Sequence, residues 1–313
     1  MIHEPTEAKP HTPVGLQNGT AKVCAVVIAY FPDTGFKDRL LQILSQVDAL
    51  VVVDNTPRGD DAWRSEMPAD DLARIQLIEN RENLGIAKAL NQGLAHAVSI
   101  KHRWILTLDQ DTQCYPDMVR TLLEATAACT PEPAVTGGNY FDPKMGRHEA
   151  PTAAANNCIE RKTVITSGCL VESAFAHSIG GFREDYFIDQ VDNEFCLRVR
   201  AHGGRVVITA KPVMNHSVGG HSGPKVPFFG MTLPDHSPLR KYYITRNSVV
   251  TVRTYWKAEP IWCLKRLIRL MLGLPGMVLL ERYKLTKTKA FAVGFVDGLN
   301  RRMGPCKKKW LMM

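Results

Sequence analysis

The sequence lacks the features that mark zinc-binding, disulfide-rich or repetitive proteins. Its eight cysteines are scattered, without a C-x-x-C pair and without clustering of histidine and cysteine. That scatter argues against a zinc site and a disulfide framework, and it suits free thiols in a reducing compartment. No internal repeat or low-complexity tract is present. With 45% hydrophobic and 22% charged residues in 313 positions, the composition is that of a globular protein with a substantial core.

Long apolar segments are also missing. The longest uncharged run of the C-terminal part, residues 270–280, has 11 residues, well short of the ~20 that a membrane-spanning helix needs. The N-terminal residues are polar, contain prolines and lack an apolar centre. They do not resemble a signal peptide, and residues 1–21 are predicted to be a mobile N-terminal leader.

Acidic residues are rare near the C-terminus. Residues 240–313 contain 17 lysines and arginines against three acids, a net charge of +14, so the first 239 residues carry −6 of the total +8. The basic residues alternate with Trp, Leu and Ile, which fits a segment lying on an anionic membrane surface. A helical cap with a solvated basic face fits equally well. We therefore expect a main domain over 22–238 and a basic, partly apolar helical extension over 239–313.

Short apolar runs alternate with stretches of helical periodicity in the first half of the chain. This alternation predicts an α/β fold with a mostly parallel sheet flanked by helices. Residues 131–157 are predicted to be rich in loops. The predicted strands are Val23–Ala29, Leu50–Val53, Ile75–Ile78, Trp104–Leu108 and Val206–Thr209. The predicted helices are Phe36–Val47, Leu84–Ile100, Pro116–Cys129 and one that starts near Val191.

Polar side chains follow the predicted strands directly. Tyr30 follows the first strand, Asp54 the second, and Asp109 and Asp111 the fourth. In open α/β sheets, ligands gather outside the carboxyl ends of the strands. Two carboxylates one residue apart form a polar turn or bind a hard cation that also holds a substrate's phosphates. Their shared location favours a nucleotide site.

A series of segments between about residues 23 and 300 resembles the inverting nucleotide-sugar glycosyltransferases of the GT-A fold, family 2. Within that family the chain is most similar to bacterial rhamnosyltransferases. These include the enzymes that add the second rhamnose of rhamnolipids and those that build O-antigens and other polysaccharides. The resemblance implies a GT-A, Rossmann-like sheet. The matching segments are AYFP, VVVDN, ENLGIAKALNQGL, LDQDT, SGCL, GGFREDYFIDQVDNEFCLR, NHSVG, HSPLRKYYITRN and LLERYKLTKTKAFAVGFVDGL.

The resemblance implies a divalent cation on the donor's diphosphate. Asp111 would ligate Mg²⁺ or Mn²⁺, and Asp109 would bind the ribose or assist at the metal. His216 falls where family members often carry a further metal or diphosphate contact. Considered alone, His216 would be a histidine of a surface loop.

The resemblance also implies where the nucleoside lies. Tyr30 and Asp54 would contact the nucleobase or ribose, although Asp54 also fits a turn formed with Asn55. Asn83 and Gly85 precede a helix, where Gly85 would let the backbone approach the nucleotide closely. Asn83 also fits a helix N-cap.

The resemblance assigns Asp192 as the general base that takes the proton of the acceptor hydroxyl. Asp192 lies six residues before Arg198, where the family often has Glu-Asp. Here Val191 replaces the first acid, which leaves the role of Asp189 open. Without the resemblance, both aspartates fit an acidic start of a helix.

These assignments imply an inverting transfer of L-rhamnose from dTDP-L-rhamnose to a hydroxyl of an amphiphilic acceptor. The acceptor would be a mono-rhamnolipid, or alternatively a lipid-linked glycan as in O-antigen synthesis. The enzyme would be cytoplasmic and peripheral on the inner face of the cytoplasmic membrane. The choice between thymidine and uridine in the donor rests on the resemblance alone.

Three other interpretations fit the sequence less well. A phosphatase of the haloacid dehalogenase type needs Asp-x-Asp-x-Thr or Val after its first strand, whereas Gln113 occupies the fifth position here and the triplet follows the fourth strand. A basic protein that binds nucleic acid should line its groove with basic and aromatic residues, but the expected site is lined with acids. A catalytically inactive relative would not be expected to keep the motifs.

Overall fold

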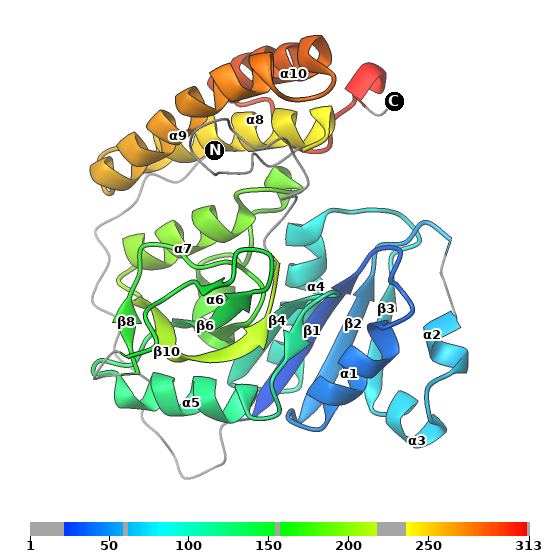
Figure 1. Cartoon of the computed structure of the whole chain (residues 1–313). Coiled ribbons are helices and arrows are strands. Elements are labelled where there is room, and N and C mark those ends of the chain that lie inside the picture. Colours follow the sequence, from blue (N-terminus) through cyan, green and yellow to red (C-terminus); the bar gives the residue numbers. More distant parts are fainter. Residues whose placement is uncertain (1–21, 59–61, 154–156, 218–235, 312–313) are drawn as a thin grey trace. The chain divides into compact units, whose positions relative to one another are not determined.

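The computed structural model describes residues 22–58, 62–153, 157–217 and 236–311 (Figure 1). The predicted leader, residues 1–21, lies outside them. The contacts divide the chain into two compact units. The sheet unit comprises the chain up to Arg183 together with Phe195–Ser217, and the helical unit comprises Glu184–Glu194 and the chain after Ser217. The division expected from the sequence placed residues 184–194 with the sheet, whereas their contacts group them with the C-terminal helices.

The sheet unit contains a mixed sheet whose first part is parallel. Among the described residues the strand order is β3-β2-β1-β4-β9-β6-β10-β5, with β7 beside β6 and β8 beside β10. Pairs β1–β2, β2–β3, β1–β4 and β6–β10 are parallel. The strands are β1 Val23–Ala29, β2 Ala49–Asp54, β3 Ile75–Glu79, β4 Trp104–Asp109, β5 Gln113–Cys114, β6 Val135–Asp142, β7 Arg147–His148, β8 Ile159–Glu160, β9 Cys169–Glu172 and β10 Val206–Asn215. The predicted α/β fold with a mostly parallel sheet is confirmed.

Helices cover the sheet, with α1 and α4 on opposite faces (Figure 1). The helices up to α7 are α1 Phe36–Leu44, α2 Ala62–Ser65, α3 Ala69–Leu72, α4 Ile86–Ser99, α5 Met118–Ala128, α6 Ser173–Ser178 and α7 Val191–Ala201. The C-terminal helices are α8 Pro238–Tyr255, α9 Pro260–Leu279 and α10 Lys284–Leu299. Short 3₁₀ helices cover Glu184–Tyr186 and Lys309–Leu311. The predicted helical extension is therefore confirmed.

The packing of α4 on the sheet explains how its N-terminus reaches the ends of the strands. Every residue of β1 is buried, as expected for a parallel strand covered on both faces. Leu90 and Leu94 bury one stripe of α4. Between them, Gly93 lies so close to β1 that a Cβ there would be 2.2 Å from Cγ1 of Val26. A larger residue at 93 would push the helix away from the sheet.

Strand β6 contradicts the predicted loop over residues 131–157. It lies between β9 and β10 and is almost entirely buried. Its sequence, VTGGNYFD, shows no apolar alternation because close packing requires glycines in its centre. A Cβ on Gly138 would lie 2.5 Å from Cγ2 of Val213 and 3.0 Å from the carbonyl oxygen of Gly168.

The cysteines also differ from the expectation of free thiols only. Cys129 and Cys158 form a disulfide with a Cα–Cα distance of 6.1 Å. The two are 29 residues apart, and such spacing gives no signal in a sequence. The other six cysteines are buried thiols. Burial raises the pKa of Cys24 and of Cys114 to about 12, so these thiols are chemically inert.

The helical unit is held together by close helix packing and a buried ion network. A Cβ on Gly294 of α10 would lie 2.6 Å from the carbonyl oxygen of Tyr242 on α8. Glu281 accepts from Nζ of Lys241 at 2.7 Å and from Nζ of Lys287 at 2.8 Å. These buried charges are stable there because they are paired. None of the helices in the described ranges is both long and apolar enough to span a bilayer.

Candidate active site

The register of the parallel strands brings the predicted donor-binding residues to one edge of the sheet. Ala29, the last residue of β1, pairs with Asp54 at the end of β2. On the other side of β1, Ile28 pairs with Asp109 at the end of β4. Tyr30, Asp54 and Asp109 therefore leave the sheet at neighbouring positions, which is where α/β sheets bind nucleotides.

Asp109, Asp111 and His216 form a cluster at this edge. One potential ligand atom from each lies within 4.8 Å of the other two. The β10–β5 pairing, with Asn215 opposite Gln113, brings His216 beside the turn that carries the aspartates. His216 is buried, Asp109 is half-buried and Asp111 is exposed. The cluster is thus open to solvent on the side of Asp111.

A network of hydroxyl groups orients His216. Its Nδ1 lies 3.4 Å from Oγ1 of Thr112, which in turn lies 2.5 Å from Oγ of Ser167. The same Ser167 oxygen accepts from the backbone N–H of Asp109 at 3.1 Å. With Nδ1 facing Thr112, Nε2 faces Oδ2 of Asp109 at 3.8 Å. The ring edge packs against Tyr140, with the ring centroids 5.9 Å apart.

The potential ligand atoms of the Asp109–Asp111–His216 cluster suit a hard divalent cation. Two carboxylates and one imidazole supply three ligand atoms, and the exposure of Asp111 leaves room for further oxygen ligands such as phosphates. The sequence reasoning did not assign roles to Thr112 and Ser167, although Ser167 opens the SGCL segment of the resemblance. The roles of Thr112 and Ser167 depend on hydrogen bonds to residues far away in the chain, which the sequence does not show.

Tyr30 is tied to the acidic turn through Gln110. The backbone N–H of Tyr30 donates to Oε1 of Gln110 at 2.6 Å, and Nε2 of Gln110 donates to the carbonyl oxygen of Tyr30 at 3.1 Å. The rings of Tyr30 and Phe31 lie edge to face, 4.7 Å apart, and both are exposed. Exposed aromatic rings at a strand end can stack on a planar ligand such as a nucleobase.

Asp54 carries a buried carboxylate oxygen without a hydrogen-bond partner among the described residues. The side chain is only 2% exposed. Its Oδ1 accepts from the backbone N–H of Thr56 at 2.8 Å, so the expected turn is present. Its Oδ2 is unpartnered. A buried acceptor in this state is destabilising, and an N–H or O–H group of a ligand would satisfy it.

Asn83 and Gly85 shape the entry to α4. Gly85 is the N-cap and has φ of 87°, a conformation that favours glycine. Asn83 is therefore not the N-cap, but its Oδ1 accepts from the N–H of Gly85 at 3.0 Å. The carbonyl oxygen of Gly85 accepts from Nδ2 of Asn55 at 3.2 Å, which places this turn beside the Asp54 turn.

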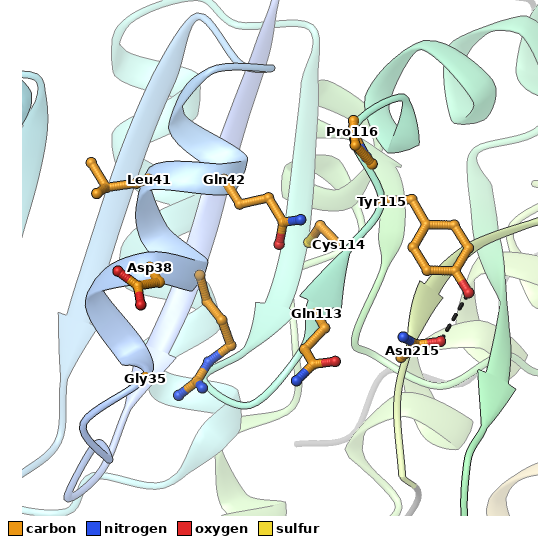
Figure 2. Close-up of a pocket in the computed structure, with 10 residues that line it drawn as sticks. Gly35, Asp38, Leu41, Gln42, Gln113, Cys114, Tyr115, Pro116 and Asn215 are labelled. Atoms are coloured by element: carbon orange, nitrogen blue, oxygen red, sulfur yellow. Dashed lines mark hydrogen bonds between the residues drawn. The ribbon is translucent and has the colours of Figure 1, made fainter.

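An open cavity of about 670 Å³ lies between α1 and the chain after the acidic turn (Figure 2). Tyr115 donates its hydroxyl hydrogen to Oδ1 of Asn215 at 2.8 Å on one side of the cavity (Figure 2). None of the site residues expected from the sequence lines this cavity, although Asn215 directly precedes His216. The cavity is lined by Gly35, Asp38, Arg39, Leu41, Gln42, Gln113, Cys114, Tyr115, Pro116 and Asn215.

The predicted base belongs to the helical unit. Asp192 is in the first turn of α7, and its Oδ1 accepts from the backbone N–H of Asn193 at 2.8 Å. Asp189 pairs with Arg240 of α8 at 2.7 Å. Burial lowers the pKa of the Arg266 guanidinium, and the carboxylates of Asp192 and Asp189 oppose that shift because they favour its charged form. Asp189 and Asp192 therefore interact electrostatically with two arginines, Arg240 and Arg266.

Comparisons with known proteins point to one family. The sequence model described as "Glycosyl transferase family 2" matches residues 24–187, more than half of the chain. The chain is 28% identical over 248 residues to the dTDP-rhamnosyl transferase RfbF of Shigella flexneri, which covers 74% of this chain and 80% of that protein.

Solved structures show the same fold at low sequence identity. S. aureus TarS 1-349 in complex with UDP-GlcNAc is similar with a TM-score of 0.62 and 14% identity, over 90% of this chain and 82% of that one. GalNAc-T7 with UDP, GalNAc and Mn²⁺ is similar with a TM-score of 0.53 and 10% identity, over 91% of this chain and 57% of that one.

Proposed function

The chain belongs to glycosyltransferase family 2, and we propose that it transfers L-rhamnose from dTDP-L-rhamnose to a hydroxyl group of a lipid-borne acceptor, with inversion. It has the GT-A fold and is a glycosyltransferase. The Asp109–Asp111–His216 cluster carries the proposal, because transfer of the sugar releases a negatively charged nucleoside diphosphate, whose charge must be neutralised. The choice of rhamnose is supported by the similarity to RfbF.

In the proposed donor complex, the strand ends hold the nucleoside. The unpartnered Oδ2 of Asp54 would accept from the nucleobase or the ribose. Tyr30 and Phe31 would stack on the base, and the protein backbone at Gly85 would lie close to the nucleotide. These contacts fix the donor without taking part in bond breaking.

Asp109, Asp111 and His216 would hold Mg²⁺ or Mn²⁺, with His216 binding through Nε2. When bound, the cation would neutralise the charge that develops on the diphosphate leaving group. Asp109, which pairs with Ile28 near the end of β1, would alternatively bind the ribose. Thr112 and Ser167 keep the imidazole and the Asp109 backbone in place.

Asp192 is the proposed general base. It would accept the proton of the acceptor hydroxyl as that oxygen attacks the anomeric carbon. The first turn of a helix stabilises a carboxylate in its charged, proton-accepting form. A single displacement inverts the anomeric centre, so a β-linked donor would give an α-L-rhamnoside.

The acceptor is proposed to be a mono-rhamnolipid, which would become a di-rhamnolipid. The alternative is the growing, lipid-linked chain of an O-antigen or another polysaccharide. We propose that residues 140–157 and 219–237 shape the acceptor pocket; these two segments lie partly outside the described residues.

A donor panel tests the proposal. We expect dTDP-L-rhamnose with Mg²⁺ and mono-rhamnolipid to release nucleoside diphosphate at least about tenfold faster than UDP-L-rhamnose or dTDP-D-glucose. These two analogues separate recognition of the base from recognition of the sugar. The same panel without acceptor measures background hydrolysis. Faster release from an unrelated sugar nucleotide would contradict the rhamnosyl assignment.

We further propose that α9 docks the enzyme on the anionic inner face of the cytoplasmic membrane. The helix exposes an apolar stripe at helical spacing: Ile261 is 70% exposed, Leu272 72% and Leu279 67%, with Leu264 and Ile268 between them. Apolar side chains that are exposed together on one surface mark interaction sites.

Charge favours a lipid partner for this stripe. Lys265 and Arg269 follow Leu264 and Ile268 directly in the sequence and are exposed. An apolar face beside basic residues suits an anionic bilayer, where each basic residue near the surface contributes about 1 kcal/mol before screening by salt. Exposed leucines would not contribute to binding the charged backbone of a nucleic acid, so we propose no nucleic acid partner.

Sedimentation with anionic vesicles tests the docking. Wild-type protein should bind at low salt and detach as salt rises. The double variant Leu264→Glu/Leu272→Glu should bind at least about tenfold more weakly, because burying a leucine contributes about 1.5–3 kcal/mol. Met145→Glu, on an exposed apolar residue of the sheet unit, is the control and should bind as wild type does. Absence of wild-type binding at low salt would rule the docking out.

A further inference from the structure

Two polar residues in the middle of α8 are completely buried and direct their side chains to one stretch of main chain. Arg246 and Asn247 are each 0% exposed. Both donate hydrogen bonds to carbonyl oxygens between residues 185 and 189. That stretch leads directly into α7, whose first turn carries Asp192. All of these residues belong to the helical unit.

Asn247 gathers three carbonyl oxygens around one amide group. Its Nδ2 donates to the carbonyl oxygens of Tyr186 at 3.0 Å, Ile188 at 2.8 Å and Asp189 at 2.8 Å. An amide group has two N–H donors, so one of them is shared between two acceptors. Buried carbonyl groups outside regular structure require such donors. Asn247 thus replaces the backbone partners that a helix or strand would supply.

Arg246 fixes the orientation of that amide. Its Nε donates to Oδ1 of Asn247 at 2.9 Å, which turns Nδ2 toward the loop. The rest of the guanidinium donates to the carbonyl oxygens of Asp185 at 3.2 Å, Tyr186 at 3.1 Å and Gly304 at 2.6 Å. The group also stacks over the ring of Tyr243, 4.8 Å from its centroid. Three of these four hydrogen bonds therefore go to main-chain carbonyl oxygens.

The stretch that these residues hold is strained. Phe187, Asp189 and Gln190 have φ angles of 64°, 63° and 65°, in the left-handed region that residues other than glycine seldom adopt. Three such residues within four positions persist only where the surrounding structure determines them. Arg240, at the start of α8, adds a further contact through the carboxylate of Asp189 at 2.7 Å.

We propose that Arg240, Arg246 and Asn247, the α8 clamp, are positioning residues for the base. They hold residues 185–190 in the strained conformation, and this conformation fixes the direction of the first turn of α7 and of the Asp192 carboxylate. The inference rests on the proposed role of Asp192. It gives α8 a part in catalysis that differs from the membrane docking of α9.

Asn247→Asp is the most direct test, because it keeps the shape of the side chain and removes the N–H donors. Hydrogen–deuterium exchange at amides 185–192 should become faster, while exchange in α10 stays slow. With dTDP-L-rhamnose and mono-rhamnolipid, kcat should fall about 10²-fold, as expected for a displaced catalytic group. The Kd for dTDP with Mg²⁺ should not change, because the donor-site residues lie in the sheet unit.

Tyr243→Phe is the matched control. It removes a buried hydrogen bond of the same helix, from the N–H of Cys306 to the Tyr243 hydroxyl at 2.6 Å, and keeps the ring. A general loss of stability would affect both variants, so Tyr243→Phe should lower Tm while kcat stays at the wild-type level. If both variants lose the same activity at the same Tm, the clamp has no specific role.

The outcomes separate this inference from the proposed function. If the wild-type enzyme transfers no rhamnose, the proposed function is wrong. Independently of that result, unchanged hydrogen–deuterium exchange at amides 185–192 in Asn247→Asp would show that the α8 clamp does not hold this stretch. Faster exchange with wild-type kcat would overturn the positioning role. If Asn247→Asp does not fold, Arg240→Gln takes its place, because its side chain is 42% exposed. This variant should lower kcat at constant dTDP affinity, and wild-type kcat would refute the clamp.

Discussion

Replacing Asp192 by asparagine is expected to lower kcat by a factor of about 10²–10⁴, the usual contribution of a general base. Asparagine has nearly the same shape but cannot accept the proton of the acceptor hydroxyl. The affinity for dTDP with Mg²⁺ should remain that of the wild type, since Asp192 belongs to the helical unit and the proposed donor-site residues belong to the sheet unit. Steady-state kinetics and calorimetric titration with dTDP measure the two effects separately.

Asp189→Asn is the matched control for this experiment. The Asp189 side chain is nearly buried and pairs with Arg240, which fits a supporting role at the entry to α7. Its replacement should therefore reduce kcat less than Asp192→Asn does. The opposite ranking, with an inactive Asp189→Asn and a nearly normal Asp192→Asn, would move the base to Asp189.

Asp111→Ala is expected to abolish turnover without unfolding the protein. Asp111 is exposed, so its loss leaves no buried cavity and should not change Tm. It is also one of the three cluster residues, so its loss should prevent neutralisation of the diphosphate. Thermal melts and turnover assays with Mg²⁺ or Mn²⁺ test both statements.

Asp70→Ala, which removes an exposed aspartate of α3, is the control and should have wild-type turnover. Excess chelator should inactivate the wild-type enzyme, and added Mg²⁺ or Mn²⁺ should restore it. Full activity in excess chelator would contradict the role of the cluster as a cation site.

The sheet could be predicted from the sequence where strands are apolar on both faces. Strand β1 was predicted with its observed bounds, because all seven of its residues are apolar and buried. Strand β6 could not be predicted, because its glycines are required by neighbours that are distant in the sequence. Strand β10 extends to Asn215, beyond the predicted end at Thr209, through a segment with a proline and shifts of register.

The site was predictable to the extent that it lies at strand ends. Asp54 and Asp109 follow apolar runs, and the sheet register places them at one edge. His216 was identified through the resemblance, since its nearness to Asp109 depends on the long connection to β10. Gln110 and Thr112 were missed because their roles are hydrogen bonds to residues far away in the chain.

In the helical unit, the charge of a residue did not predict whether its side chain is buried or exposed. The sequence suggests that the basic residues of the extension lie on a solvated or membrane-facing surface. Arg246 and Lys287 are instead buried, one against carbonyl oxygens and the other against Glu281. The sequence pattern does not distinguish a buried arginine, whose N–H groups are hydrogen-bonded, from an arginine on the surface. The α8 clamp could therefore be recognised only in the structure.

The NMR spectrum of the product formed from dTDP-β-L-rhamnose tests the central claim most directly. It reports both the transferred sugar and, through the C1–H1 coupling, the configuration of the new bond. A single displacement assisted by Asp192 predicts an α-L-rhamnosyl group attached to the acceptor. A β-L-rhamnosyl product would contradict the inverting mechanism, and a product without rhamnose would contradict the proposed function.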